Sequence, residues 1–300
     1  MTSFAPIYTE EAGRRVCVVT VSFHSEEVLK QMLASLPSGT EKVIVDNASE
    51  VSSQMQNLQK QHVFTYLPMT SNRGFGTACN EGARQSSREF LFFLNPDASL
   101  TEGCLDALLE AMDAHPQASA VNPRIQSSRG RIEFKYRSVL LPRTEWRDRR
   151  PPNTVCEMPA LTGGAMLVRR EAFEKVGGFD EAIFLYHEDD DLSIRLRQHA
   201  GPLLYVPDAL VNHQAGHSSG RSAKVAFHKA YHKGQSRVYA MKKHGVPAAK
   251  LRCLISAIQE LLNPLNLLSR RKRMQAMGFF MGVMKGTGPV TASGTKARRD

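Results

Sequence analysis

The sequence contains few cysteines, and they are not arranged to cross-link a fold or to bind a metal. There are five in 300 residues, an odd number, and no two form a Cys-x-x-Cys pair. This spacing argues against a disulfide framework and against a zinc site made of thiolates. We expect the cysteines to be small buried hydrophobic residues.

Long apolar runs are also missing. The longest apolar tract, residues 274–284, is interrupted by Gln275 and two glycines, and it is shorter than the roughly 18 residues that a membrane-spanning helix needs. Residues 1–15 have no apolar core of the kind that a secretory signal contains. We therefore expect a chain that does not cross a membrane by itself and that lies in the cytoplasm.

Acidic residues are scarce near the C-terminus. Residues 221–300 hold 17 Lys or Arg but only Glu260 and Asp300 as acids, a local charge of +15 against +10 for the whole chain. The preceding 220 residues therefore sum to −5. A basic segment on a mildly acidic body predicts an anionic partner, such as a membrane surface, a phosphorylated lipid or a nucleic acid.

What is present is an ordinary globular composition with alternating strand and helix patterns. The chain is 42% apolar and 23% charged, which is enough to bury a substantial core. Apolar, largely β-branched or aromatic runs predict strands at residues 16–21, 42–45, 63–67 and 90–94. Helical periodicity or composition predicts helices between them at 25–36, 51–61 and 76–85. This alternation predicts an α/β fold with a mostly parallel, Rossmann-like sheet flanked by helices.

The pattern changes twice further along the chain. Residues 126–157 are rich in Arg, Ser and Pro and lack periodicity, so we predict a loop excursion near the site before the pattern resumes at Ala160. Beyond residue 222, basic helical segments replace the strands. We therefore predict an α/β domain at 14–222, a basic helical extension at 223–286 and a disordered tail at 287–300.

Polar side chains follow two of the predicted strands. Asp46 and Asn47 follow the second strand, where they could contact a base or a ribose or form an ordinary Asx turn. Asn95 and Asp97 follow the strand at 90–94. The Asp97 carboxylate could bind a divalent cation on phosphate oxygens, or cap a helix. The carboxyl ends of strands border the crevice where open α/β sheets bind ligands.

Closely spaced glycines introduce the next predicted helix. Asn72, Gly74, Gly76 and Asn80 lie where backbone N–H groups could meet a phosphate, although a plain turn between strand and helix explains them equally. The chain contains neither the G-x-G-x-x-G fingerprint nor a P-loop. A dinucleotide-dependent dehydrogenase and a P-loop NTPase are therefore disfavoured.

Four consecutive acids, residues 188–191, follow His187. Crowded carboxylates raise one another's pKa, as a general base requires, but an acidic helix N-terminus would look the same. His213 and His217, in a later loop, are candidate metal or diphosphate ligands.

Together these segments resemble family 2 glycosyltransferases with the GT-A fold, in particular the rhamnosyltransferase-like branch. The resemblance extends from about residue 16 to 218, in order and at plausible spacing. The matching motifs are Val18–Ser22, Val45–Ser49, Asn72–Gly82, Leu94–Asp97, Gly163–Arg170, Val176–Glu181, Phe184–Leu192 with Arg195, and His213–Ser218. Each motif alone is weak, but eight in register are specific.

The resemblance implies an inverting transfer of a sugar from a nucleotide diphosphate. Residues 14–100 would bind the nucleotide sugar, and residues 101–222 would bind the acceptor. Asp189 would be the base, with Glu188 and Asp191 as its nearest rivals. Asp97 and His213 would hold Mg²⁺ or Mn²⁺ on the diphosphate. The residues expected to bind the nucleotide sugar are Ser22, Asp46, Asn47, Asn72, Gly74, Gly76, Asn80, Asn95, Gly164 and Arg195.

The resemblance also implies partners. The donor would be dTDP-rhamnose, and the acceptor a saccharide or a polyprenyl-diphosphate-linked saccharide in cell-surface polysaccharide synthesis. The basic run 270–273 could bind the inner face of the cell membrane, with apolar residues of 274–284 in the interface: Met274, Met277, Phe279, Phe280 and Met284. Alternatively, this helix packs on the body or on a partner subunit. The sequence does not decide whether the protein is a homo-oligomer.

Two other functions are compatible with parts of the sequence. A nucleotidyltransferase shares the α/β plan, but no glycine-rich basic loop follows the first strand. A non-catalytic module could bind an anionic surface through the basic tail. Nucleic acid is not expected as a partner, because that tail has few aromatic residues interleaved for base stacking.

Overall fold

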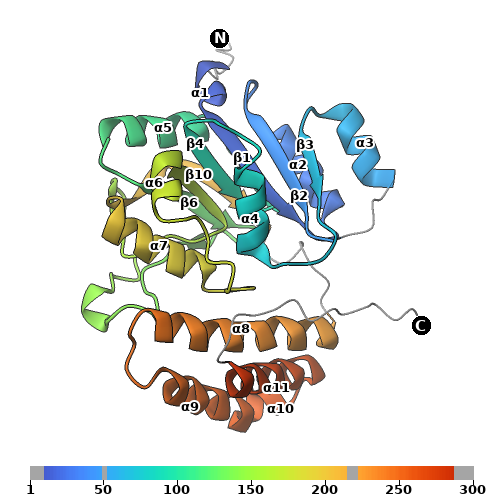
Figure 1. Ribbon diagram of the computed structural model, residues 1–300, viewed down its shortest axis with the longest axis vertical. Coiled ribbons are helices and arrows are strands. Elements are labelled where there is room, and N and C mark those ends of the chain that lie inside the picture. Colours follow the sequence, from blue (N-terminus) through green and yellow to red (C-terminus); the bar gives the residue numbers. More distant parts are fainter. Residues whose placement is uncertain (1–9, 49–52, 215–221, 287–300) are drawn as a thin grey trace.

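The structure, a computed structural model, describes residues 10–48, 53–214 and 222–286. Its strands are β1 (Val16–Ser22), β2 (Glu41–Asp46), β3 (Thr65–Pro68), β4 (Phe90–Leu94), β5 (Ala98–Leu100), β6 (Ala120–Ser127), β7 (Ile132–Glu133), β8 (Cys156–Glu157), β9 (Ala165–Arg169) and β10 (Leu203–His213). Its helices are α1 (Glu10–Arg14), α2 (Glu26–Ala34), α3 (Ser53–Gln61), α4 (Phe75–Ala83), α5 (Cys104–Ala114), the short 3-10 helix η1 (Arg143–Glu145), α6 (Arg170–Lys175), α7 (Glu188–His199), α8 (Ala223–Lys243), α9 (Ala249–Leu262), α10 (Pro264–Leu267) and α11 (Arg270–Lys285). Figure 1 shows a sheet covered by helices, with α8 to α11 forming a further layer at one end of the molecule.

The strands of the first hundred residues form a parallel sheet. β3, β2, β1 and β4 lie side by side in that order. Every residue of β1 is buried, and its side chains alternate between two hydrophobic clusters. One cluster includes α2, α3 and α5, and the other includes α4, α6 and α7. β-Branched runs suit a strand that helices cover on both faces, and the predicted α/β fold is confirmed.

The second half of the sheet is mixed. β9 pairs antiparallel with both β4 and β6, whereas β10 pairs parallel with β6 and antiparallel with β5. Because β9 runs against β4, its first residue, Ala165, lies opposite Leu94, the last residue of β4. This pairing places the turn at residues 163–164 beside Asn95, whose N–H donates to Gly164 O at 3.0 Å.

Residues 126–157 are largely irregular, as their composition predicts. After the end of β6 they contain only β7, η1 and β8 as regular elements. β7 pairs with β6, and β8 pairs with β10, so the excursion is attached to the second half of the sheet.

The C-terminal helices cross one another closely. A Cβ on Gly278 or Gly282 of α11 would lie 2.3 Å from Phe227 O or 2.0 Å from Tyr231 O of α8, so only glycine permits this approach. Phe279, between them, is 2% exposed. The expectation that Phe279 faces a membrane is therefore wrong, because this side of α11 packs against α8.

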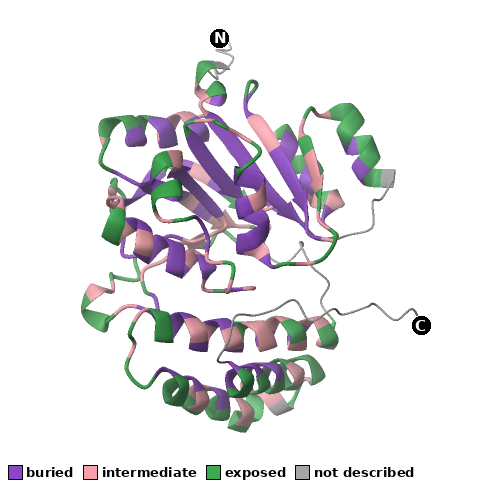
Figure 2. Cartoon of the chain, in the orientation of Figure 1, coloured by how far each residue is buried: buried purple, intermediate pink, exposed green. Residues whose placement is uncertain are grey.

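Buried residues fill the sheet, and exposed ones gather on the outer sides of the helices (Figure 2). In the described part of the chain, no helix combines the length and the hydropathy needed to span a bilayer. The predicted division between residues 222 and 223 coincides with Ser222, whose side chain caps α8 by accepting from Val225 N–H. Whether residues 14–222 form an independent domain stays a prediction.

Candidate active site

Five of the predicted site residues lie at one edge of the sheet. Ser22 and Asp46 are register partners at the carboxyl ends of β1 and β2. Asn95 and Asp97 follow β4, and His213 is the last residue of β10. The topology therefore brings these side chains to the edge where open α/β sheets bind ligands.

Asn95, Asp97, His213 and Glu133 form one group, called here the Asp97 cluster. His213 Nε2 lies 3.2 Å from Asp97 Oδ1 and 3.5 Å from Asn95 Nδ2, and its Nδ1 lies 3.2 Å from Glu133 Oε2. Burial alone would lower the pKa of His213, but the two carboxylates outweigh it and raise this pKa to about 9. A metal ion that bound His213 would therefore have to displace the proton that this pKa places on the imidazole at neutral pH.

The Asp97 cluster has two groups of the kind that divalent cations bind, a carboxylate and an imidazole. The described residues include no set of three His, Cys, Asp or Glu side chains arranged to hold a metal ion. Mg²⁺ is commonly bound through one or two carboxylates together with substrate phosphates. The residues present therefore fit a cation that binds together with a diphosphate. His217, the other histidine predicted as a ligand, lies outside the described residues.

The end of β2 provides buried polar groups beside this cluster. Asp46 is 1% exposed and accepts a 2.6 Å hydrogen bond from the Tyr66 hydroxyl. Burial and the Asp46 carboxylate both raise the pKa of Tyr66, so its phenol stays a donor. Ser22 Oγ is buried and has no hydrogen-bond partner among the described residues. A buried polar atom without a partner is costly, which makes this hydroxyl a candidate contact for a ligand.

Asn47 shapes the loop that precedes α4. Its Nδ2 donates to Asn72 Oδ1 at 3.0 Å and to Gly74 O at 3.2 Å, and its Oδ1 accepts from Arg73 N–H at 3.0 Å. The amide of Asn47 is thus used to fix the conformation of the loop. Its predicted contact with a nucleotide sugar stays a prediction.

The predicted glycine motif ties α4 to the segment before α7. Gly74 has φ 91°, and a Cβ there would lie 2.3 Å from Phe184 O. A Cβ on Gly76 would lie 2.9 Å from Phe179 Cβ. Asn80 Nδ2 donates to Phe179 O, and Asn80 Oδ1 accepts from Phe179 N–H, both at 2.9 Å. These contacts are structural, and direct binding of a nucleotide sugar by these residues stays a prediction.

The acidic run begins α7 after a turn with unusual backbone angles. Tyr186 and His187 have φ 66° and 70°, which costs non-glycine residues on the order of 1–3 kcal/mol each. Three donors hold the Asp189 carboxylate. Its Oδ2 lies 2.6 Å from Lys135 Nζ and accepts from Gly163 N–H at 3.1 Å, and its Oδ1 accepts from the N–H of the next residue at 2.8 Å. The side chain stays 17% exposed, so a substrate can still reach it.

The acids on either side of Asp189 differ in protonation. Burial and the neighbouring Asp189 carboxylate raise the pKa of Glu188 to about 8, and Glu188 Oε2 has no hydrogen-bond partner in the described structure. Burial acts the same way on Asp190, but Lys135 and His187 outweigh it and lower the pKa of Asp190. Glu188 is therefore mostly neutral at pH 7, and a neutral carboxyl is a poor base.

The predictions for Asp191 and Arg195 need correction. Asp191 is 0% exposed; its Oδ2 lies 2.7 Å from Arg195 Nη2, and its Oδ1 lies 2.7 Å from Lys243 Nζ and 2.8 Å from His244 Nε2. Arg195 also donates to Val176 O. The pair joins α7 to the end of α8. Asp191 is thus inaccessible as a base, and the Arg195 guanidinium is bound within the protein rather than presented to a diphosphate.

Two short segments connect the Asp97 cluster with the Asp189 carboxylate. A Cβ on Gly163 would lie 3.2 Å from Asp189 Cβ, and one on Gly164 would lie 3.7 Å from the side-chain amide of the cluster. Glu133 belongs to the cluster, and Lys135, two residues later, contacts Asp189. Because Cα atoms of consecutive residues are about 3.8 Å apart, each of these two short segments spans only a small distance. The cluster and the carboxylate therefore border a single site.

Glu133 and Lys135 are site residues that the sequence did not single out. Both lie in the aperiodic stretch 126–157, where no motif marks one charged residue above another. The only signal was the expectation that this excursion lies near the site.

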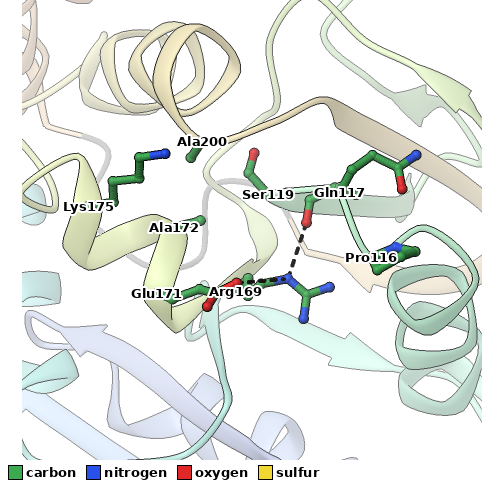
Figure 3. Close-up of a pocket in the computed structure, with 9 residues that line it drawn as sticks. Pro116, Gln117, Ser119, Arg169, Glu171, Ala172, Lys175 and Ala200 are labelled. Atoms are coloured by element: carbon green, nitrogen blue, oxygen red, sulfur yellow. Dashed lines mark hydrogen bonds and ion pairs between the residues drawn. The ribbon is translucent and has the colours of Figure 1, made fainter.

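A pocket of about 290 Å³ lies elsewhere. Ser119, Arg169 and Lys175 are among its lining residues (Figure 3). Arg169 pairs with Phe90, the first residue of β4, so the pocket lies toward the opposite edge of the sheet from Asp97. None of the predicted site residues lines it, and we do not place the active site there.

Comparison with known proteins agrees with this geometry. The family model described as glycosyl transferase family 2 matches residues 17–177, more than half of the chain. A second model, the N-terminal domain of galactosyltransferase, matches residues 149–212. The N-acetylglucosaminyl-diphospho-decaprenol L-rhamnosyltransferase of Mycobacterium tuberculosis (strain H37Rv) is 32% identical over 263 residues, covering 76% of this chain and 84% of that protein.

Solved structures show the same fold at lower identity. The mannosyltransferase PcManGT of Pyrobaculum calidifontis, in complex with GDP-Man and Mn²⁺, is 15% identical with a TM-score of 0.54, covering 95% of this chain and 88% of that one. TarS residues 1–349 of S. aureus, in complex with UDP, is 15% identical with a TM-score of 0.53, covering 90% of each chain. The chain therefore has the GT-A fold and belongs to glycosyl transferase family 2.

Proposed function

We propose that this glycosyltransferase transfers L-rhamnose from dTDP-rhamnose to a saccharide carried on a polyprenyl diphosphate, with inversion, during synthesis of a cell-surface polysaccharide. The relative from M. tuberculosis supports both the sugar and the acceptor class, because its name states L-rhamnose and a diphospho-decaprenol acceptor. Family membership favours sugar transfer over the two alternatives, a nucleotidyltransferase and a non-catalytic surface-binding module.

One observation carries the mechanism: in the turn at residues 163–164, Gly163 N–H donates to Asp189 Oδ2 and Gly164 O accepts from Asn95 N–H of the Asp97 cluster. A single displacement needs a base near the attacking hydroxyl and a stabilised leaving group beyond the anomeric carbon. Asp189 on one side of the turn and the Asp97 cluster on the other meet these two requirements.

Asp189 acts as the general base in this proposal. It takes the proton from the acceptor hydroxyl while the hydroxyl oxygen attacks the anomeric carbon and the bond to the diphosphate breaks. The Gly163 N–H and the Lys135 ammonium hold the carboxylate in place before the acceptor binds. Such orientation lowers the entropic cost of the reaction.

The Asp97 cluster receives the leaving diphosphate. Asp97 and His213 are the residues that would hold Mg²⁺ or Mn²⁺, with Asn95 beside them. A bound divalent cation would neutralise the charge that develops on the leaving group. On the donor side, Asp46 and the unpartnered hydroxyl of Ser22 are assigned to the nucleoside, and Gly164 allows the sugar to approach the backbone closely.

The first test separates donor binding from chemistry. Thermal-shift and calorimetric titrations of dTDP, UDP and GDP and their sugars, with and without Mg²⁺ or Mn²⁺, should show metal-dependent stabilisation by dTDP-rhamnose, because a ligand that binds the folded state raises the melting temperature. Asp97→Ala should remove the metal dependence. Equal binding of all three nucleotides, or none, would contradict the assigned donor.

The second test addresses the base. Asp189→Asn should lower kcat for rhamnose transfer on the order of 10²–10⁴-fold, the usual contribution of a general base, while donor binding by calorimetry is retained. Asp208→Asn, which changes an exposed acid of β10, is the matched control and should leave kcat unchanged. Full turnover by Asp189→Asn would exclude this residue as the base.

A further inference from the structure

The layer of helices beyond α8 exposes an unusual amount of apolar surface. On α9, Leu251, Ile255, Ile258 and Leu262 recur at spacings of four, three and four residues, which places them on one face. Each is at least 40% exposed, and Leu262 is 74% exposed. This face lies opposite the one through which α9 packs, where Cys253 and Ala257 are buried.

The stripe continues onto the neighbouring elements. Met277, Met281 and Met284 of α11 are 46–50% exposed, again at spacings of four and three residues. Leu265 of α10 and Leu268, directly after it, are 62% and 83% exposed. We call these nine exposed residues the α9–α11 face: Leu251, Ile255, Ile258, Leu262, Leu265, Leu268, Met277, Met281 and Met284. α9 and α11 pack together through a shared hydrophobic cluster, and Figure 1 shows α9, α10 and α11 together on the side of α8 away from the sheet.

Cations surround this apolar face. Residues 270–273, all Lys or Arg, are exposed at the start of α11. Lys250 and Arg252 lie at the start of α9, and Lys285 ends α11. Glu260 is the only acid in residues 222–286. Single exposed leucines are normal on soluble proteins, but rows of exposed apolar side chains on neighbouring helices that also carry many cations are typical of a contact surface.

We propose that the α9–α11 face is a membrane-binding surface, which lies in the interface of an anionic bilayer with its apolar side chains among the acyl chains and its cations on the headgroups. The purpose of this contact rests on the proposed function, because an acceptor on a polyprenyl diphosphate is confined to a membrane. Helices with an apolar face and a basic polar face bind bilayers in this orientation.

Charge decides between a membrane and the other candidate occupant, a second copy of this chain. If two copies met through the α9–α11 face, the basic rim of one copy would approach the basic rim of the other. Glu260 is the one acid that residues 222–286 of each copy could offer to offset these cations. Like charges at close range oppose such a contact. Anionic headgroups instead complement every cation of the rim.

Vesicle flotation of the full chain tests the proposal. The chain should float with vesicles of phosphatidylcholine mixed with phosphatidylglycerol, should remain unbound with phosphatidylcholine alone, and should be released by high salt. The double variant Ile255→Gln/Met281→Gln should bind at least tenfold more weakly. Lys250→Ser/Arg270→Ser removes two exposed cations beside the stripes of α9 and α11 and should weaken binding about 25-fold, since each cation contributes roughly fivefold.

Controls separate this proposal from the proposed function. Val63→Gln changes a side chain that is 91% exposed on the other part of the molecule, and it should float like the unchanged chain. All variants should transfer rhamnose normally to a water-soluble short-chain acceptor.

Flotation without any transfer would overturn the proposed function alone. Transfer without flotation, or flotation that neither double variant weakens, would contradict the proposal that the α9–α11 face binds a membrane. A dimer in sedimentation that Ile255→Gln/Met281→Gln dissociates would assign the face to a second copy instead.

Discussion

At the scale of single residues, Lys135 is the most important member of the candidate site that the sequence does not reveal. Its ammonium lies 2.6 Å from Asp189 Oδ2 and 3.1 Å from Asp190 Oδ1, so one cation serves two carboxylates. Burial lowers the pKa of Lys135, but these two acids outweigh it and raise the pKa above its ordinary value. Lys135 is therefore charged at neutral pH. It does not touch the reacting atoms in the proposed mechanism, and we regard it as a positioning residue.

Lys135→Met should lower kcat by roughly 10²-fold, the cost of a small displacement of a catalytic group, with the KM for the donor little changed. The acid limb of the rate profile should also move to higher pH, because Lys135 lowers the pKa of Asp190 and Glu188, and both acids would bind protons more readily without it. A purely structural role for Lys135 would not shift this limb.

Two further variants serve as controls for Lys135→Met. Lys135→Arg keeps the charge and should recover much of the activity with an unshifted acid limb. Lys175→Met removes an exposed lysine of α6 and should behave like the unchanged chain. An unshifted profile in Lys135→Met would show that Lys135 does not act through the carboxylates.

At the scale of elements, α7 has two functions on two faces. Residues two positions apart on a helix point about 200° apart, so Asp189 faces the site while Asp191 faces α8. Burial raises the pKa of Asp191, but His244, Arg195 and Lys243 outweigh it and lower this pKa to about 2. The folded-state pKa lies below the unfolded value of 3.8. This pairing therefore stabilises the fold above pH 3.8, and the stabilisation is lost as the pH falls toward 2.

Asp191→Asn should destabilise the protein by roughly 3 kcal/mol at pH 7, because it leaves Arg195 and Lys243 with less compensation for their charges. The difference between the variant and the unchanged chain should shrink as the pH falls through the range from 4 to 2, which thermal unfolding at several pH values would measure. Asp208→Asn, on the exposed side of β10, should show no such difference. An equal melting temperature at pH 7 would contradict the role of Asp191 as the tie between α7 and α8.

Elements in the first half of the fold could be predicted because their signals are local. The runs at 16–21 and 90–94 are buried on both faces, and that burial is visible in their composition. The antiparallel pairing of β9 with β4 could not be predicted, because the partner of a strand is set by the tertiary fold and not by its own residues. The same limit applies to the turn at residues 163–164, whose place beside Asn95 depends on that pairing.

The site was predictable to the same degree. Asp46, Asp97 and Asp189 stand at ends of predicted elements, where polar groups reach a ligand crevice, so the sequence could single them out as candidates. The motif that contains Asp191 and Arg195 predicts site residues, but their spacing of four residues is also that of an ordinary helical ion pair, which is what the structure shows. Lys135 could not be found, since only the fold brings an irregular loop onto α7.

At the scale of the whole molecule, the C-terminal helices complete the core of the transferase. Leu140, Ile183 and Ile194, from the part before residue 222, are buried in one cluster with side chains of α8, α9 and α11. Lys243 of α8 also lies 2.6 Å from Asp180 Oδ2. The basic extension is therefore packed on the body, and its outer face is exposed.

A chain shortened to residues 1–222 should accordingly fail to fold stably. It would expose the three apolar side chains just named, each worth about 1.5–3 kcal/mol when fully buried, a loss comparable to the whole stability of many domains. We expect aggregation on size-exclusion chromatography and no cooperative thermal transition. A chain ending at residue 286 keeps every described helix and should unfold like the full chain. If residues 1–222 instead unfolded cooperatively and bound the donor, the body would be an independent domain. The helices α8 to α11 would then be needed only for binding a partner.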